Sequence, residues 1–324
     1  MSGLDWRDLP VLVTGGAGFI GSHLVDALVE RGARVRVLDD LSTGRRENLA
    51  GVADRIELVE GDVRDPETCR RAAAGVRVVL HQAALGSVPR SMADPATTIA
   101  VNVAGTANVF AAARDAGVHR VVYASSSSVY GDSPALPKRE GEEGRPLSPY
   151  ALSKAMDEEL AQVFGTAFGL ELVGLRYFNV YGPRQDPAGP YAAVVPRFFA
   201  ACRAGEAPVI HGDGEQSRDF TYVADAVAAN LLAAAAPAEA CGRAYNVAGG
   251  RRTTINEIAA EIRRLTQEWA QERGGPCPEP VHADPREGDV RHSHADLTAA
   301  REALGYEPRV PLAEGLARTF EALT

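Results

Sequence analysis

Short apolar runs alternate with longer amphipathic segments through the first 180 residues. Nearly continuous apolar runs occupy residues 11–15, 34–40, 56–62, 76–84 and 120–126, and segments of helical length follow several of them. Strands that are apolar on both faces and joined by helices are typical of βαβ units around a parallel sheet. The pattern therefore predicts an α/β fold with a Rossmann-type, doubly wound parallel sheet.

After a further apolar run at residues 172–182, the chain changes to Pro- and Gly-rich loops mixed with shorter helices. This change places a domain boundary near residue 180. We expect a Rossmann domain over residues 1–180 and a smaller C-terminal substrate lobe over residues 181–324. Within that lobe, residues 243–249 have the pattern of a late strand that returns to the first sheet.

The composition narrows the choice of partners. The chain has 324 residues, of which 45% are hydrophobic and 24% charged, and a net charge of −9. An acidic surface repels phosphate backbones and anionic lipids, so we expect no nucleic-acid and no membrane partner. The first ten residues lack the basic and apolar run of a signal peptide, and no stretch has the length and apolarity of a membrane span. We expect a cytoplasmic protein.

No metal site or disulfide framework is expected. The four cysteines, Cys69, Cys202, Cys241 and Cys277, are far apart and form no C-x-x-C pair, which predicts free thiols in a reducing compartment. The histidines near the C-terminus have no set of acidic or thiolate partners in the sequence, so we expect them to be exposed loop residues. These histidines are His282, His292 and His294.

A glycine-rich turn indicates a dinucleotide cofactor. The stretch VLVTGGAGFIGSHL places Gly15, Gly18 and Gly21 between a predicted strand and a predicted helix. In this context glycines allow the backbone amides and the helix N-terminus to approach a pyrophosphate. Asp39 ends the next strand, where a carboxylate can accept both ribose hydroxyls and disfavours the 2′-phosphate of NADP. Arg45 and Arg46 could hold that 2′-phosphate, but an exposed arginine pair is more often a solvated surface.

The stretch LSPYALSK places Tyr150 and Lys154 one helical turn apart. Ser148 is a favourable N-cap and Pro149 suits the first helical position. An ammonium about 4 Å from a phenol, at an effective dielectric near 20, favours the phenolate by up to about 4 kcal/mol and lowers a phenol's pKa toward about 7. A phenol in this range can act as a general base. Such pairs also occur without function; the preceding dinucleotide loop favours the catalytic interpretation.

Four serines, residues 125–128, follow a strand that should end at the ligand-binding edge of the sheet. A hydroxyl both donates and accepts hydrogen bonds, so one of these serines could relay a proton between a substrate hydroxyl and Tyr150. The run could also be a linker, but it lies abruptly between the strand and VYG.

Together these motifs resemble the extended short-chain dehydrogenase/reductase family and, within it, the nucleotide-sugar 4-epimerases. The resemblance covers almost the whole chain, through TGGAGFIGSHL, LDDLSTG, HQAALGSVPRS, SSSSVYG, SPYALSK, RYFNVYGPRQDP, GDGEQSRDFTYV and REGDVRHSHAD. The strings HQAALGSVPRS, YFNVYGPRQDPAGPYAAVVP and GDVRHSHAD are most similar to members that act on UDP-N-acetylglucosamine. The resemblance implies C4 epimerisation of a UDP-hexose through a transient 4-keto sugar, with NAD kept bound.

The resemblance also implies site residues. The catalytic residues would be Ser126, Tyr150 and Lys154. The loop and the resemblance together assign the NAD site to Gly15, Gly18, Phe19, Ile20, Gly21, Asp39, Asp40, Ser42, Thr43, Gly44, Asp62, Val63, Gln82, Ala83, Ala84, Asn102, Ser125, Tyr150, Lys154, Tyr177 and Val180. The UDP-sugar would contact Ser87, Arg90, Ser126, Ser127, Asn179, Gln185, Ala193, Val194, His211, Arg218, Arg286, Asp289 and Ser293.

Related activities stay open as alternatives. In the resembling 4,6-dehydratases an Asp-Glu pair stands at the positions of Ser127 and Ser128, and in the decarboxylases a Glu stands at that of Ser128, so the serines favour epimerisation. The small Ser293 implies room for an N-acetyl group near sugar C2. UDP-glucuronate and UDP-glucose 4-epimerases are the nearest alternatives, and a non-enzymatic NAD-sensing protein is a remote one because such proteins typically lack the Tyr/Lys pair. The family also implies a homodimer formed through helices near residues 98–114 and 151–168.

Overall fold

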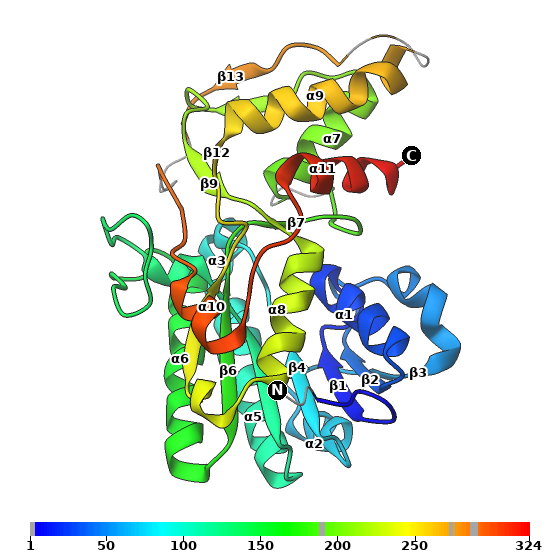
Figure 1. The fold of residues 1–324 in the computed structure, drawn as a ribbon, viewed down its shortest axis with the longest axis vertical. Coiled ribbons are helices and arrows are strands. Elements are labelled where there is room, and N and C mark those ends of the chain that lie inside the picture. Colours follow the sequence, from blue (N-terminus) through cyan, green and yellow to red (C-terminus); the bar gives the residue numbers. More distant parts are fainter. Residues whose placement is uncertain (1–3, 188–191, 272–274, 276, 286–290) are drawn as a thin grey trace.

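A seven-stranded sheet forms the centre of the molecule (Figure 1). The computed structural model describes residues 4–187, 192–271, 275, 277–285 and 291–324. All neighbouring strands of this sheet are parallel, in the order β11-β6-β5-β4-β1-β2-β3. The predicted Rossmann-type fold is therefore confirmed. The strands are β1 (Pro10–Thr14), β2 (Arg34–Asp39), β3 (Ile56–Glu60), β4 (Val78–His81), β5 (Arg120–Ser126), β6 (Glu171–Tyr177) and β11 (Arg243–Val247).

Helices cover both faces of the sheet, which explains why its strands are nearly all apolar. Alternate residues of one strand enter different cores: Val11 and Val13 of β1 lie in one, and Leu12 lies in the other. The first face carries α1 (Phe19–Glu30), α8 (Val223–Ala235) and α10 (Thr298–Leu304). The second face carries α2 (Pro66–Ala73), α5 (Gly105–Asp115) and α6 (Pro149–Phe168).

One long helix differs from expectation. α4 (Pro95–Ile99), the π-helical turn η2 (Ala100–Ala104) and α5 run on without a break from Pro95 to Asp115. By length and composition this helix could cross a membrane, whereas we expected no such stretch. Its contacts with α2 and α6 account for its apolar residues, and 44% of its most apolar window is buried inside the molecule.

A second core lies at the top of Figure 1, where α7 (Val194–Ala204), α9 (Ile255–Gln271) and α11 (Leu312–Glu321) gather. Three two-stranded sheets accompany these helices. They pair β7 (Val180–Tyr181) with β10 (Thr221–Tyr222), β9 (Ser217–Asp219) with β12 (Arg252–Thr254), and β8 (Val209–His211) with β13 (Val281–Ala283). Between these pieces the chain returns to the large sheet, where β11 pairs with β6 and α8 packs on the first face. The boundary near residue 180 stays a prediction.

The remaining short elements connect this framework. Between the strands and helices above lie η1 (Arg46–Arg55), α3 (Val88–Ala93), η3 (Ser127–Tyr130) and η4 (Ala238–Ala240). η3 begins at the predicted serine run, directly after β5. The serines therefore form the end of a strand and the start of a helical turn, and the linker interpretation is wrong.

Two of the four cysteines are paired, contrary to expectation. Cys202 of α7 and Cys277, 75 residues later, form a disulfide, whereas Cys69 and Cys241 are free. The sequence separation concealed this contact. Cys202 and Cys277 lie in the same core, and Cys277 follows α9, which packs against α7. Disulfides are rare in a reducing cytoplasm. The cytoplasmic location therefore stays a prediction without support from the thiols.

Candidate active site

Two adjoining cavities lie above the carboxyl edge of the sheet. The larger, of about 590 Å³, reaches from the glycine loop to Tyr150 and Lys154. The smaller, of about 380 Å³, extends from it toward α7 and β8. Residues common to both walls, among them Asn179 and Gln185, make them one continuous cleft. Ligands of doubly wound sheets bind at this edge, where the strand order reverses between β1 and β4.

The glycine loop is a close-packed cradle. Gly15 has a φ of +67°, and a Cβ on it would lie 2.7 Å from the amide nitrogen of Ala83. A Cβ on Gly21 would lie 2.1 Å from the carbonyl oxygen of Gly15, so no larger residue fits there. Gly18 is the N-cap of α1 and brings no side-chain cap, which leaves the first amides of the helix for an anion. This cradle fits a dinucleotide pyrophosphate.

Asp39 supplies the acidic group expected beside the adenosine ribose. Its carboxylate is 6% exposed and accepts hydrogen bonds from the amides of Ala17 (2.9 Å) and Leu41 (2.8 Å). Burial raises the pKa of Asp39, and these two amides act in the opposite direction. Arg45 and Arg46 form ion pairs with Asp186 and Glu60 instead, and neither lines the cavity. The residues present therefore fit NAD.

The predicted NAD residues line the larger cavity, except Gly44 and Asn102. Gly44 packs against Asp39, whose Oδ1 would lie 2.8 Å from a Cβ at this position. Asn102 is fully buried in the π-helical turn and bonds the Leu85 backbone and the Ser153 hydroxyl. Direct contact of these two residues with NAD stays a prediction, because the structure places them next to wall residues rather than in the wall. The sequence missed Leu38, Gly61, Leu85, Gly86, Val88, Val101, Ala124 and Ser128, which mostly lie next to predicted positions.

Many of the predicted substrate-binding residues line the smaller cavity. Its wall includes Ser87, Asn179, Gln185, Ala193, Val194, His211 and Arg218, while Ser126 and Ser127 line the larger cavity. Arg90 and Ser293 line neither. Arg90 lies one residue beyond the part of α3 that faces the cavity, and the Ser293 amide donates to the carbonyl of Ser217 at 3.0 Å. Arg286 and Asp289 lie outside the described residues. The missed wall residues include Tyr181, Arg197, Phe198, Gln216 and Phe220.

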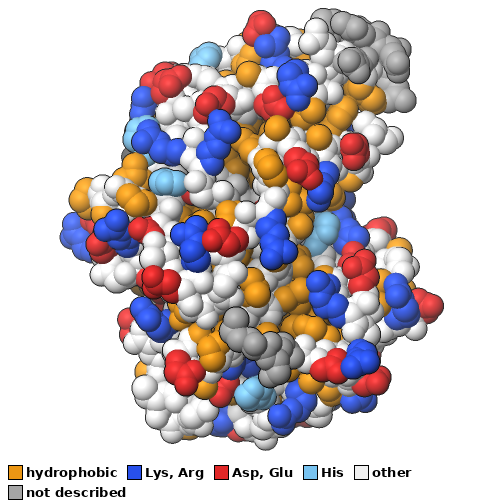
Figure 2. Space-filling view, viewed as in Figure 1, with side chains coloured by type: hydrophobic (Ala, Val, Ile, Leu, Met, Phe, Trp, Pro, Cys, Tyr) orange, Lys and Arg blue, Asp and Glu red, His pale blue; other side chains and the backbone are white. Residues whose placement is uncertain are grey.

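Charges of both signs are interspersed on the surface, and the wall of the cleft contains uncharged polar atoms. Figure 2 shows acidic and basic side chains mixed over the face that it draws. Three polar atoms of wall residues, Ser128 Oγ, Gln185 Oε1 and Gln216 Oε1, are buried and accept or donate no hydrogen bond within the described chain. Buried polar groups without partners are uncommon, so these atoms point to a polar ligand.

The serine, tyrosine and lysine meet in the larger cavity. As predicted, the Ser148 hydroxyl caps α6 by accepting from the Ala151 amide at 3.1 Å, with Pro149 at the first position. Tyr150 and Lys154 then lie one turn apart, and both line the cavity together with Ser126 from the end of β5. Lys154 is 2% exposed, and its Nζ donates to the carbonyl of Ala124 at 2.9 Å.

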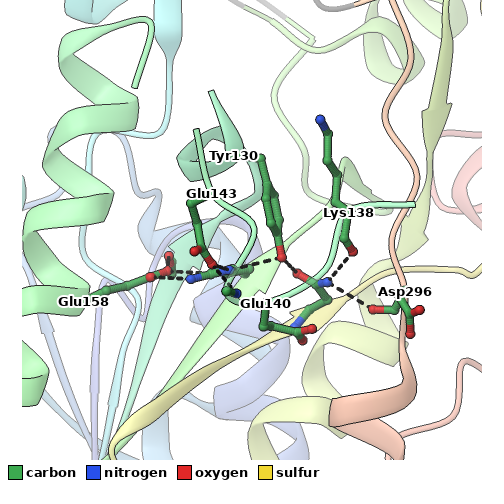
Figure 3. A network of polar contacts seen from close by, with 10 residues as sticks. Tyr130, Lys138, Glu140, Glu143, Glu158 and Asp296 are labelled. Atoms are coloured by element: carbon green, nitrogen blue, oxygen red, sulfur yellow. Dashed lines mark hydrogen bonds and ion pairs between the residues drawn. The ribbon is translucent and has the colours of Figure 1, made fainter. Parts of the chain in front are cut away.

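A buried arginine holds the elements that carry these residues (Figure 3). Arg176 of β6 binds Glu158 of α6 in a bidentate pair at 2.9 and 2.7 Å. Its Nη1 donates to the Tyr130 hydroxyl at 3.0 Å and also contacts Glu143. Glu158 additionally accepts from the hydroxyl of Ser125. One guanidinium therefore joins α6, the end of η3 and the loop that precedes Tyr150.

The network continues into the C-terminal segment. The Tyr130 hydroxyl donates to Asn246 Oδ1 at 2.7 Å, and Asn246 Nδ2 donates to the carbonyls of Lys138 and Asp296, both at 3.0 Å (Figure 3). Local sequence patterns do not indicate these contacts, because they join residues 50 to 116 positions apart.

Two of the three C-terminal histidines are half-buried, which corrects the expectation of exposed loop residues. His294 Nδ1 lies 3.0 Å from Asp219 Oδ2, and His292 Nδ1 lies 2.9 Å from the Ser217 hydroxyl. His282 is exposed, in β13. Within the part of the chain that the structure describes, no group of histidines, cysteines and carboxylates could hold a metal ion.

The sequence of this cleft matches a known family. Residues 11–248 match the NAD dependent epimerase/dehydratase family. The chain belongs to this family. It is accordingly an NAD-dependent enzyme, and the resemblance inferred from the motifs is confirmed.

Individual relatives are similar over nearly their full length. A UDP-glucose 4-epimerase of Mycolicibacterium smegmatis is 44% identical over 96% of this chain and 97% of its own. The structure of the Thermotoga maritima UDP-glucose 4-epimerase with UDP-glucose superposes with a TM-score of 0.90 at 39% identity, covering 97% and 98% of the two chains. A UDP-N-acetylglucosamine 4-epimerase of Methanobrevibacter ruminantium, in complex with UDP-N-acetylmuramic acid, has a TM-score of 0.90 at 38% identity, covering 98% of both chains.

Replacing Asp39 tests the cofactor site. We expect Asp39→Ala to weaken NAD binding by about 10- to 100-fold, because a ribose partner is lost and two buried amides lose their acceptor. Arg46→Ala, which removes a charge outside the cavity, is the matched control and should bind NAD normally. Calorimetric titration of NAD and NADP measures both variants; unchanged NAD affinity in Asp39→Ala contradicts the assignment.

Proposed function

We propose that this enzyme interconverts C4 epimers of UDP-hexoses, with UDP-GlcNAc and UDP-GalNAc as its preferred pair. One observation carries the reaction type: Ser126, Tyr150 and Lys154 converge in a cavity that fits NAD and opens into a second cavity of nucleotide-sugar size. The similar enzymes from M. smegmatis and T. maritima support 4-epimerisation. Their names favour UDP-glucose as a second candidate substrate.

The proposed chemistry assigns one task to each residue. Tyr150 accepts the proton of the sugar C4 hydroxyl, Ser126 relays it, and Lys154 stabilises the phenolate. When bound, NAD⁺ supplies the acceptor that takes up a hydride from C4 and later returns it. Tyr150 gives the proton back after the transient 4-keto sugar has turned over in the cleft, so the opposite C4 configuration forms without net oxidation.

The neighbouring serines support epimerisation over elimination or decarboxylation. Ser127 and Ser128 line the cavity beside Ser126, where an acid would be needed to remove water or carbon dioxide. A hydroxyl cannot replace such an acid at neutral pH because it stays protonated. UDP-glucuronate epimerisation needs no acid either and remains an alternative.

The smaller cavity is proposed to hold the UDP moiety. Arg218 lines it, and Arg286 would join Arg218 on the pyrophosphate by motif position. Two guanidiniums on one diphosphate would supply local positive charge in a protein of net charge −9. The apolar residues Val194, Phe198 and Ile210 form other parts of the same wall and suit the faces of a nucleoside.

Tyr150→Phe tests the proton transfer. The variant should fold and keep NAD but lose turnover by at least about two orders of magnitude, the usual scale of general acid–base catalysis. Lys154→Ala should have a similar effect, because the charge beside the phenol is lost. Turnover and the amount of bound NAD are measured on the same preparation. If Tyr150→Phe turns over close to the wild-type rate, the mechanism is refuted.

The substrate preference is tested by parallel incubation of the wild type with UDP-GlcNAc, UDP-Glc and UDP-GlcA. We expect the highest kcat/KM for UDP-GlcNAc, with C4 epimers resolved by NMR. If only UDP-Glc or only UDP-GlcA is epimerised, the preference is wrong and that alternative replaces it.

Ser293 is the proposed determinant of sugar size. The Ser293 amide donates a hydrogen bond to the carbonyl of Ser217, and Ser217 directly precedes the cavity residue Arg218. A longer side chain at position 293 would therefore be close enough to reach the sugar. Ser293→Tyr should abolish turnover of UDP-GlcNAc and spare UDP-glucose, because the ring would occupy the space of the acetamide. Ser293→Ala is the matched control and should keep both substrates. Equal loss of both in Ser293→Tyr would contradict this role.

We also propose that the enzyme is a homodimer formed by α5 and α6. These helices contact each other, and their outer faces carry small or apolar residues. Leu152, Met156 and Val163 of α6 lie along one exposed helical stripe, and Val163 is 55% exposed. Two-fold pairing of such faces would remove this apolar surface from water.

Sedimentation tests the dimer. At micromolar concentration we expect a mass about twice the chain's 34.3 kDa. Val163→Arg should shift the protein toward monomer by placing an unpaired charge in the interface. Val281→Arg makes the same change at a valine of similar exposure (50%) in β13, away from α5 and α6, and should leave the mass unchanged. A monomeric wild type would refute the proposal.

A further inference from the structure

Two consecutive acids of α6 have different partners. Glu158 is engaged by the Arg176 guanidinium and the Ser125 hydroxyl (Figure 3). Asp157 faces the other way, and its Oδ2 lies 3.1 Å from Lys154 Nζ. Asp157 is 1% exposed, and its Oδ1 accepts no hydrogen bond within the described chain. The lysine of the candidate active site therefore has a buried counter-charge of its own.

We propose that Asp157 is a positioning residue that holds the Lys154 ammonium, offsets part of its charge and thereby sets the pH range over which Tyr150 works. This inference rests on the proposed roles of Tyr150 and Lys154. It adds to them a residue that touches neither cavity, because Asp157 lies behind the wall that Lys154 forms.

The other titratable groups packed around this pair are neutral or already paired. Burial, followed by the Lys154 charge, lowers the pKa of His81 on β4 to about 3, so this imidazole is neutral. Burial raises the pKa of Tyr123 on β5 well above its ordinary value, so its phenol is neutral too. Glu158 is paired with Arg176. On α5 the group facing Asp157 is the uncharged hydroxyl of Thr106.

The charge of Asp157 itself changes near pH 6. Burial raises the pKa of Asp157 to about 6, although the Lys154 ammonium and the Thr106 hydroxyl oppose this effect. Above this pH the carboxylate is ionised and offsets the lysine. Below it the carboxyl is neutral, and the full ammonium charge acts on the phenol.

Removing the Asp157 carboxylate therefore shifts the pKa values of its neighbours in one direction. A negative charge raises the pKa of every group nearby, so its loss lowers the pKa of each of them. Both limbs of the kcat/KM profile should move to lower pH. A unit charge about 8 Å away, at an effective dielectric near 20, corresponds to a movement of up to about 1.5 pH units.

The experiment compares the NAD-loaded wild type with Asp157→Asn across the pH range of activity, using the UDP-sugar that the wild type epimerises fastest. Both limbs should shift downward in the variant, KM should stay unchanged, and the two profiles should converge below about pH 6, where Asp157 is neutral. Glu159→Gln removes an exposed carboxylate from the same helix and is the matched control, with an unchanged profile expected. Asp157→Ser repeats the test if the amide variant does not fold.

The outcomes separate this inference from the proposed function. A uniform loss of kcat/KM with unmoved limbs shows a merely structural Asp157 and overturns the inference, as does an unchanged profile or the failure of both variants to fold. If Tyr150→Phe is fully active, the proposed catalytic roles fail instead, whatever Asp157→Asn does.

Discussion

The buried guanidinium of Arg176 is the contact on which the geometry of the site depends. A charge in this position must be paired, and breaking such a pair costs about 3–5 kcal/mol because the remaining charge stays buried. Its partners Glu158, Glu143 and Tyr130 come from α6, from the loop before α6 and from the turn after β5. These are the elements that carry the tyrosine, the lysine and the serine of the cleft. Satisfying one charge therefore aligns three segments.

The same network joins the two parts of the cleft. Through Tyr130 and Asn246 it reaches the carbonyl of Asp296, and the amide of Lys138 donates to the carbonyl of His294. His294 in turn lies against Asp219, next to the cavity residue Arg218. A continuous set of polar contacts thus runs from the end that fits NAD to the end proposed to hold UDP.

Buried charges in this acidic protein are matched by individual partners, and two acids adjacent in the sequence can have different partners. Asp157 and Glu158 are adjacent, yet one faces Lys154 and the other binds Arg176. Successive residues of a helix point about 100° apart, so adjacent acids can neutralise charges on different sides. Asp39 is held differently, by two backbone amides, which keep its carboxylate available beside the cleft.

The sequence by itself determined the parallel sheet, the glycine loop, Asp39 and the capped start of α6, because each depends on short-range patterns: apolar runs, steric demands on glycine, and residues one helical turn apart. It placed most of the cavity wall through its motifs. Only the tertiary structure decided the Cys202–Cys277 pair, the half-buried His294, the supporting position of Asn102 and the partners of Arg176. These depend on packing between segments distant along the chain, and local spacing carries no record of which buried groups will meet.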